Sequence, residues 1–369
     1  MKSGIKKRII YLVVAFSILF GTGCSGLFGS RIKLISPSQG DTAVAIVNKD
    51  IQSFLDEDYT NETCTKYYAP DVMHYEPEYV TFSWKGEATE LILSENKDFS
   101  DSISYQVEGN EFKIRGLKAN TDYYWKMRNE DTESEVSYFK TEDSVRTIFI
   151  EGVTNTRDMG NWPVYDEDGN EIGRMKQGVV FRTAAPERIS EDGRAYMRNE
   201  LKVKTELDLR AATEISSKYF EDINYINISA PQYAENGIFD SRQAETVRDI
   251  LSVFAEEGNY PIAFHCAVGR DRTGTLAFLL GGLCGMSKDD LCREYDLSFF
   301  ASTEKVVRFP TTMHKNCFDK LLNRMSSYKD SNKSLSYNIE QYMLDIGLTE
   351  ETITGIRNNL VESVQFEKK

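Results

Sequence analysis

The residues of this sequence with the clearest chemical potential stand in one short run, Pro261 to Gly274. The run is mostly apolar up to His265, which predicts a short buried strand, and the apolar residues after Thr273 predict a helix. Where a strand turns into a helix in this way, backbone N–H groups point into one concavity at the positive end of the helix dipole, and that concavity suits a phosphate dianion. Cys266 opens the connecting loop and Arg272 follows it, so a potential nucleophile and a cation share the site.

Cys266 and Arg272 fit the two roles that phosphoryl transfer to a cysteine requires. The loop amides and nearby guanidinium groups favour the thiolate form of Cys266, which is the nucleophilic form. The planar fork of Arg272 matches two phosphate oxygens at once. The predicted chemistry therefore passes through a cysteinyl-phosphate, and the alternative is a buried structural cysteine beside a surface arginine. The other phosphate-binding positions are predicted at Ala267, Val268, Gly269, Arg270 and Thr273.

The run from His265 to Gly274 resembles the active-site loop of the cysteine-dependent protein tyrosine phosphatase superfamily. Its ending is similar to that of the atypical bacterial tyrosine and phosphoinositide phosphatases, some of them of dual specificity, which usually read Gly-Lys-Asp-Arg-Thr-Gly. Arg270 stands here where that group has Lys, so the charge is kept but the reach differs. Asn155-Thr-Arg-Asp-Met-Gly160 and Asp208-Leu-Arg210 resemble further segments of the same group, and the resemblance covers roughly residues 147–362.

A general acid must protonate the leaving oxygen. Better-known members of the superfamily carry it in a Trp-Pro-Asp loop, but the nearest match here, Trp162-Pro-Val164, lacks the acid. The resemblance implies Asp271, whose alternative role is to hold the loop shape; Asp208 and Asp240 are the runners-up.

Other residues near the loop are expected to support it. We expect Thr273 to hydrogen-bond the sulfur or the attacking water, and His265 to order the loop from behind. Arg157 and Asp158 are expected to form a structural ion pair. The three histidines of the sequence and the absence of Cys-x-x-Cys pairs predict no metal site, and no cofactor is expected.

The N-terminus has the features of an export signal. Basic residues between Lys2 and Arg8 precede an apolar run that is short for a membrane span, and small residues lead to Cys24. Residues 1–23 therefore resemble a bacterial lipoprotein signal, which implies lipidation of Cys24 and an extracytoplasmic chain anchored to the cell membrane. An uncleaved N-terminal anchor is the alternative. The net charge of −14 argues against nucleic acid as a partner.

The chain is predicted to be multidomain. Residues 24–31 form a tether, and 32–144 contain short alternating strands that predict an all-β sandwich. The run from Leu117 to Trp125 resembles fibronectin type III domains. A long acidic insertion at 48–76 interrupts the pattern and stays unassigned. A spacer is the expected role of this domain, and a ligand- or glycan-binding module is the alternative.

Residues 145–369 are predicted to form an α/β domain with a central, largely parallel sheet flanked by helices. Ligands of such sheets bind at the carboxyl ends of the strands, which places the site just past His265. The predicted function is a phosphatase for phosphotyrosine protein, phosphoinositide or both, outside the cytoplasmic membrane. The alternatives are an inositol-phosphate (phytate-like) phosphatase, a non-catalytic surface binding protein and an adhesin.

Overall fold

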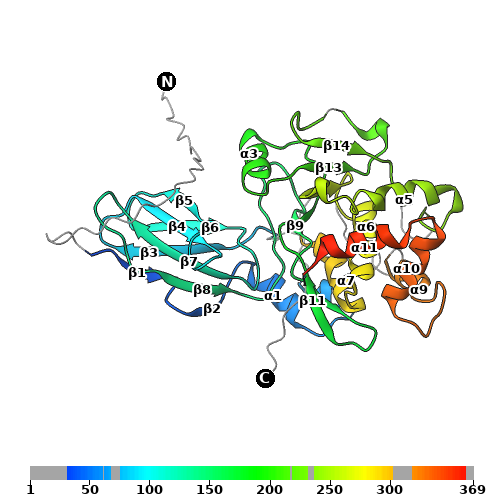
Figure 1. Ribbon diagram of the computed structural model, residues 1–369, viewed down its shortest axis with the longest axis horizontal. Coiled ribbons are helices and arrows are strands. Elements are labelled where there is room, and N and C mark those ends of the chain that lie inside the picture. The colour runs from blue at the N-terminus through cyan, green and yellow to red at the C-terminus, as the bar shows by residue number, and fades with distance from the viewer. Residues whose placement is uncertain are drawn as a thin grey trace. The chain divides into compact units, whose positions relative to one another are not determined.

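The computed structural model describes residues 31–60, 62–67, 75–216, 218–231, 237–301 and 318–362 (Figure 1). The predicted leader at 1–23, the proposed lipid site Cys24 and the tether up to residue 30 lie outside the described residues. Within the described ranges, no helix combines the length and hydropathy that a membrane span requires. The chain divides into two compact units. The all-β unit contains residues up to Ala45, Tyr79–Ile114 and Asn120–Glu142; the α/β unit contains Ile46–Glu78, Arg115–Ala119 and the chain from Asp143 onward.

The all-β unit consists of two sheets, with strand orders β1-β3-β6 and β2-β8-β7-β4-β5. The neighbours β4 and β5, β4 and β7, and β7 and β8 are antiparallel, whereas β2 joins β8 in parallel. The strands are β1 (Lys33–Ser36), β2 (Asp41–Val44), β3 (Tyr79–Lys85), β4 (Glu90–Ser94), β5 (Ile103–Gln106), β6 (Glu111–Arg115), β7 (Asp122–Arg128) and β8 (Ser137–Thr141).

Aromatic side chains fill the space between these two sheets. Phe82 and Trp84 on β3 are buried, as are Trp125 on β7 and Phe139 on β8. The Phe82 ring meets Trp125 edge-on at 5.1 Å between centroids and Phe139 at 5.8 Å, so the contact crosses from one sheet to the other. The alternation in the sequence thus produces a sheet-on-sheet core. The finer likeness to fibronectin type III domains stays a prediction.

The α/β unit is built around a five-stranded sheet with strand order β14-β13-β15-β12-β9. β12, β13, β14 and β15 run parallel, and β9 is an antiparallel edge strand, so the predicted, largely parallel sheet is confirmed. A second, antiparallel sheet has the order β10-β11-β16. The strands are β9 (Arg157–Asp158), β10 (Pro163–Tyr165), β11 (Glu171–Met175), β12 (Val180–Thr183), β13 (Thr205–Asp208), β14 (Asn224–Asn227), β15 (Ile262–His265) and β16 (Val361–Glu362).

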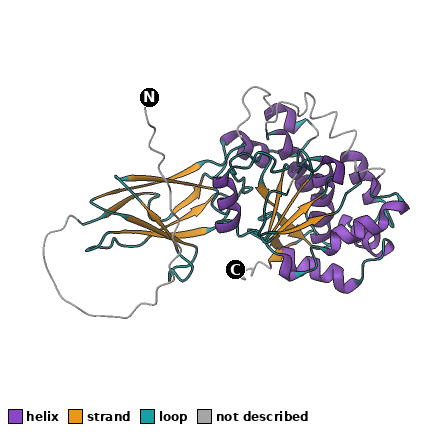
Figure 2. Ribbon diagram, turned by 90° about the horizontal axis from the view of Figure 1, so that it is seen from above, coloured by secondary structure: helices purple, strands orange, loops and turns teal. Residues whose placement is uncertain are grey.

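Helices surround the strands of the α/β unit (Figure 2). Successive residues of β15 face opposite sides of the sheet, so Ala263 joins an apolar cluster with Met197 of α3, while Phe264 meets Phe254 on the other side. The helices are α1 (Lys49–Asp56), α2 (Thr63–Tyr67), α3 (Glu191–Asn199), α5 (Ala244–Ser252), α6 (Asp271–Cys284), α7 (Lys288–Asp296), α9 (Asp319–Ser326), α10 (Leu335–Asp345) and α11 (Glu350–Leu360), with 3₁₀ turns η1 (Ala212–Glu214), η2 (Ser241–Gln243), η3 (Glu257–Asn259) and η4 (Leu297–Phe299).

Several helix starts follow directly from the sequence. The side chains of Ser190, Ser287 and Thr349 accept hydrogen bonds from backbone N–H groups in the first turns of α3, α7 and α11, as their N-cap positions predict. α6 ends at Gly285, whose φ of 99° is in the left-handed region that glycine adopts without strain. These caps fix where the helices around the sheet begin and end.

The division between the units differs from the predicted boundaries in two segments. The change after Glu142 lies close to the predicted 144/145 boundary, but Arg115–Ala119 and Ile46–Glu78, predicted to lie within the sandwich domain, group with the α/β unit. For Ile46–Glu78 the cause can be named. The physical reason is apolar burial, because α1 buries Ile51 and Phe54, and the Phe54 ring lies 5.2 Å from that of Phe300. The unassigned insertion is therefore an accessory part of the α/β unit.

Candidate active site

The predicted strand–loop–helix turn is present, with β15 ending at His265 and α6 beginning at Asp271. We call the connecting residues Cys266–Arg270 the cysteine loop. Cys266 itself is 2% exposed and forms no disulfide. Gly269 has a φ of 70°, and a Cβ there would lie 2.3 Å from the Thr183 carbonyl oxygen. Only glycine lets the loop pass this close to β12.

Two side chains hold the carbonyl groups of the cysteine loop from behind. Asn155 Nδ2 donates to the carbonyl oxygens of Val268 and Gly269, at 3.0 and 2.9 Å, and Arg182 Nη2 donates to that of Gly269 at 2.6 Å. The C=O and N–H of a trans peptide point in opposite directions. Fixing these carbonyls on one side therefore turns the amides of Gly269 and Arg270 to the other, which is the arrangement a bound oxyanion needs.

A fully buried group of charges supports that arrangement; we call Arg157, Arg182 and Glu294 the buried charge cluster. Arg157 Nε lies 2.8 Å from Glu294 Oε1, and Arg182 forms a short ion pair with Glu294 Oε2. Burial and, after it, the charge of Arg157 lower the pKa of Arg182 to about 10. The predicted pair between Arg157 and Asp158 is wrong, because Asp158 pairs with Arg146 at 3.1 Å instead.

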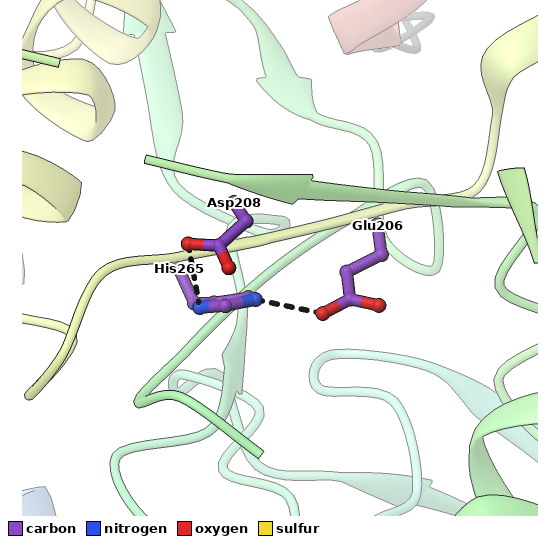
Figure 3. Close-up of side chains that lie close together, drawn as sticks. All are labelled: Glu206, Asp208 and His265. Carbon is purple, nitrogen blue, oxygen red and sulfur yellow. Dashed lines mark hydrogen bonds and ion pairs between the residues drawn. The ribbon is translucent and has the colours of Figure 1, made fainter. Parts of the chain in front are cut away.

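His265 lies between two carboxylates of β13 (Figure 3). Its Nε2 is 2.9 Å from Glu206 Oε1, and its Nδ1 is 3.2 Å from the Cys266 carbonyl oxygen and 3.8 Å from Asp208 Oδ1. The three side chains are close enough to hold a metal ion. However, Asp208 accepts hydrogen bonds from Arg210 on both oxygens, and that guanidinium would repel a cation. The contacts instead agree with the prediction that His265 orders the loop from behind.

Arg272 lies beside Cys266 with its guanidinium already oriented. Glu214 of η1 accepts from both terminal nitrogens, at 2.7 and 2.9 Å, and the Leu209 carbonyl lies 3.4 Å from Nη1. The Glu214 hydrogen bond and the neighbouring Cys266 sulfur raise the pKa of Arg272 against the effect of burial. The same contact lowers the pKa of Glu214 to about 2. Glu214 therefore holds the two terminal nitrogens of the Arg272 guanidinium, and the Arg272 Nε takes no part in this ion pair.

Asp271 is the first residue of α6, and its carboxylate is held by its neighbours. Arg270 donates to both of its oxygens, at 3.1 and 3.2 Å, and the Tyr295 hydroxyl lies 3.4 Å from Oδ1. Arg270 also lies over the Phe299 ring, 5.6 Å from its centroid. The structure thus places Asp271 and Arg270 together at the end of the cysteine loop.

The other acid candidates lie in different settings. Asp208 is fully buried; burial raises its pKa, but Arg210 and His265 lower it below the ordinary value overall. Asp240 caps η2, and Arg242 lowers its pKa to about 2. Both are held as carboxylates by an arginine on their own segment.

The Thr273 hydroxyl is buried and finds no hydrogen-bond partner in the described part of the chain. It therefore stays available as a donor when the loop takes up an anion. Its predicted hydrogen bond, to the sulfur or to the attacking water, stays a prediction.

Several residues that position the loop were missed from the sequence. Glu214, Glu294 and Glu206 hold residues that flank or support the loop, namely Arg272, Arg157 and His265. They come from separate elements, far from Cys266 along the chain, and no local pattern marks them. Asn155 offered one signal, because it opens a segment that resembles the bacterial group, and asparagine tolerates the positive φ of 54° found there.

Comparisons with known proteins identify the family of this chain. A family model described as "Tyrosine phosphatase family" matches residues 148–362. A tyrosine-protein phosphatase of Nostoc commune is 25% identical over 159 residues, which cover 41% of this chain and 49% of that protein. The match thus spans about half the length of the relative.

Two solved structures match part of this chain at low sequence identity and low TM-score. The core catalytic domain of the PP-IP phosphatase SIW14 from S. cerevisiae, solved with citrate, is 19% identical with a TM-score of 0.28, covering 42% of this chain and 91% of its own. P. aeruginosa TpbA, solved with pTyr, is 14% identical with a TM-score of 0.29, covering 51% of this chain and 97% of its own. The family match, in contrast, runs from the start of the α/β core through the cysteine loop to β16. The chain belongs to the tyrosine phosphatase family.

Proposed function

We propose that this chain is a phosphatase that hydrolyses phosphomonoesters through a covalent intermediate on Cys266. The observation that carries the proposal is the anchoring of the cysteine loop, whose carbonyls are tied back by Asn155 and Arg182 while Glu214 holds one edge of Arg272. A loop held in this way presents its amides and a guanidinium to the equatorial oxygens of a phosphoryl group without reorganising.

The proposed reaction has two steps. In the first, the Cys266 thiolate attacks phosphorus, the bond to the leaving oxygen breaks, and Asp271 gives that oxygen its proton. In the second, water attacks phosphorus and passes a proton to the Asp271 carboxylate, the sulfur–phosphorus bond breaks, and inorganic phosphate leaves. Arg272 and the loop amides bear the charge throughout.

We choose Asp271 over Asp208 and Asp240 because of its place next to the loop. Asp208 is engaged by Arg210 on both oxygens, and Asp240 by Arg242. Asp271 is held by Arg270, which a bound phosphate would also attract, so substrate can compete for that guanidinium and free the carboxyl for proton transfer.

The first test is release of p-nitrophenol from its phosphate by the chain without its leader. We expect turnover by the wild-type chain and none by Cys266→Ser, because a serine hydroxyl lacks the thiolate's nucleophilicity. Iodoacetate should alkylate Cys266 before Cys284 and Cys292, because burial raises the pKa of the Cys284 and Cys292 thiols, and vanadate should protect Cys266. A chain that binds vanadate without turnover would instead be a binding protein.

The acid assignment has its own test. Asp271→Asn should slow alkyl phosphates at least tenfold more than aryl phosphates, because a good leaving group needs less protonation. Equal losses on both classes would remove Asp271 from this role. Asp240→Asn, assayed in parallel, would identify the acid if it showed the leaving-group dependence instead.

For the substrate we propose phosphotyrosine in proteins, which the name of the Nostoc commune relative supports. Phosphoinositides and inositol phosphates are the competing classes. A panel of phosphopeptides, phosphoinositides in vesicles and soluble inositol phosphates separates them by rate.

We further propose that the chain is exported and attached to the membrane through Cys24, with the all-β unit as a fibronectin III-like spacer. The order of basic, apolar and small residues before Cys24 supports this. Membrane fractionation of the full chain and of Cys24→Ala tests it, and a wild-type chain retained in the cytoplasm would contradict it.

A further inference from the structure

The Ile46–Glu78 segment lies against the elements that support the cysteine loop. Besides the Phe54–Phe300 contact, the Tyr59 hydroxyl donates to Asp296 Oδ2 at 2.9 Å. Arg293 Nη2 donates to the Glu57 carbonyl at 2.7 Å. The segment therefore contacts α7 and the residues just after it, at several points along its length.

The same stretch of chain also contacts residues that hold or adjoin the cysteine loop. Glu294 and Ser298 accept from both Arg157 and Arg182, and Arg182 donates to the Gly269 carbonyl. Tyr295 reaches Asp271. Residues 294–298 are thus shared between the 46–78 segment and the loop.

Tyr75, near the end of the segment, contacts Arg157 of the buried charge cluster directly. It is 8% exposed, and its hydroxyl oxygen accepts from Arg157 Nη1 at 3.1 Å. The same nitrogen donates to Asn155 Oδ1 at 2.7 Å. Because the amide oxygen of Asn155 faces Arg157, its Nδ2 faces the carbonyls of Val268 and Gly269. Three side chains therefore connect the segment to the loop: Tyr75, Arg157 and Asn155.

The geometry explains what the Tyr75 hydroxyl adds. Arg157 already bonds Glu294 through Nε and Nη2, so Nη1 is the part of the guanidinium that turns to Asn155 and Tyr75. An unsatisfied N–H of a buried guanidinium costs more free energy than a hydrogen bond gains, so each acceptor that faces Arg157 helps to hold it in place. With both acceptors present, the plane of Arg157 is fixed, and so is the amide of Asn155.

We propose that Tyr75, in the described part of the Ile46–Glu78 segment, is a positioning residue of the active site that acts on the cysteine loop through Arg157 and Asn155. The inference rests on the proposed phosphatase function, since it assigns a role in that reaction. Tyr75 does not touch the reacting atoms; it keeps the loop amides aimed at the phosphoryl oxygens.

The test replaces Tyr75 by Phe in the chain that lacks only the predicted leader. This substitution deletes one hydroxyl and keeps the ring. We expect kcat on p-nitrophenyl phosphate to fall about tenfold with little change in KM, because a loop held less firmly loses transition-state stabilisation first. Vanadate affinity, measured by calorimetry, should fall by a similar factor. The melting temperature checks that the variant is folded.

Tyr59→Phe is the matched control, since it removes one hydroxyl from the same segment without touching Arg157 or Asn155. It should keep wild-type kcat and vanadate affinity. Wild-type values for a folded Tyr75→Phe, or equal losses for both variants, would overturn the role of Tyr75.

A double variant tests the route. In an Asn155→Ala background, Tyr75→Phe should have almost no further effect, because the group it acts through is gone. A further tenfold loss there would overturn the route through Asn155. If the wild-type chain showed no turnover, the proposed function would be wrong. The vanadate affinities of the variants would then decide by themselves whether Tyr75 positions the loop.

Discussion

The two units of this chain bury different kinds of side chain. The largest fully buried residues of the all-β unit are aromatic, such as Trp84 and Trp125, and an ion pair such as Arg31–Glu135 lies on its surface with both side chains more than 80% exposed. In the α/β unit, Arg157, Arg182 and Arg210 are as deeply buried as those rings. All the buried arginines among the described residues belong to the α/β unit.

This difference distinguishes residues that stabilise the fold from residues that position the groups of the active site. Burying aromatic surface stabilises a unit roughly in proportion to the area that is buried, and this stabilisation depends little on how the side chains are oriented. Burying a guanidinium costs desolvation free energy, which a single carboxylate such as Glu294 offsets only with good geometry. The buried charge cluster is therefore poorly explained by stability alone. Arg182 donates directly to the Gly269 carbonyl, and Arg157 reaches the loop carbonyls through Asn155.

The largest effect is expected when the carboxylate of the buried charge cluster is removed. Glu294→Gln is nearly isosteric, but it leaves Arg157 and Arg182 without a counter-charge, so the α/β unit should lose about 3–5 kcal/mol of unfolding free energy. Urea denaturation followed separately for each unit measures this loss. Phosphatase activity should fall even where the variant stays folded, because both arginines position the loop.

The surface provides the control for that substitution. Glu135→Gln breaks the exposed pair with Arg31 in the all-β unit and should change stability by less than about 0.5 kcal/mol. A cost for Glu294→Gln as small as that for Glu135→Gln would mean that the two kinds of ion pair do not differ.

The features that could be read from the sequence are local ones. The order strand, cysteine loop, helix follows from apolar runs around Cys266 and Arg272, and N-caps such as Ser287 follow from residue type. The residues from Tyr79 to Trp84 alternate in the way typical of a half-buried strand, and β3 shows that burial pattern. Each of these signals lies within about a dozen residues, which is the range over which periodicity and capping act.

The features that could not be read depend on contacts between distant segments. Glu294 lies on α7, whose sequence shows only a capped amphipathic helix, and nothing there reveals that it faces two arginines from β9 and β12. The partner of Arg157 was mistaken for Asp158 because adjacent opposite charges suggest a pair, whereas neighbours on a strand face opposite sides. Tyr75 belongs to a segment without a clear pattern, so its role depends on the fold alone.

A smaller effect is expected from a conservative change in the aromatic core. Phe82→Leu keeps an apolar side chain between the sheets and loses the edge contacts with Trp125 and Phe139, so the all-β unit should lose about 1.5 kcal/mol. Urea denaturation of the all-β unit measures it. A loss as large as that for Glu294→Gln would show that this core, too, depends on exact geometry.

The smallest effect on stability concerns Glu214, which is polar and partly exposed and yet belongs to the site. Its pKa is lowered from 4.5 to about 2 by the hydrogen bond with Arg272. A carboxyl whose pKa is lowered by folding stabilises the folded state above the unfolded pKa, and this contribution is lost as the pH falls through the folded value. The stability difference between wild type and Glu214→Gln should therefore be constant above about pH 5 and disappear toward pH 2.

The side chain of Glu214 is 32% exposed, so solvent screening keeps the stability difference between wild type and Glu214→Gln small. The effect of the same substitution on catalysis should be larger. Without the carboxylate, Arg272 loses the partner that fixes one edge of its fork, and kcat/KM should fall about tenfold. A pH series of urea midpoints and a rate assay at pH 6 measure the two effects on the same pair of proteins. If Glu214→Gln lost stability but kept its kcat/KM, Glu214 would act like Phe82 in stabilising the fold and would not position the groups of the active site.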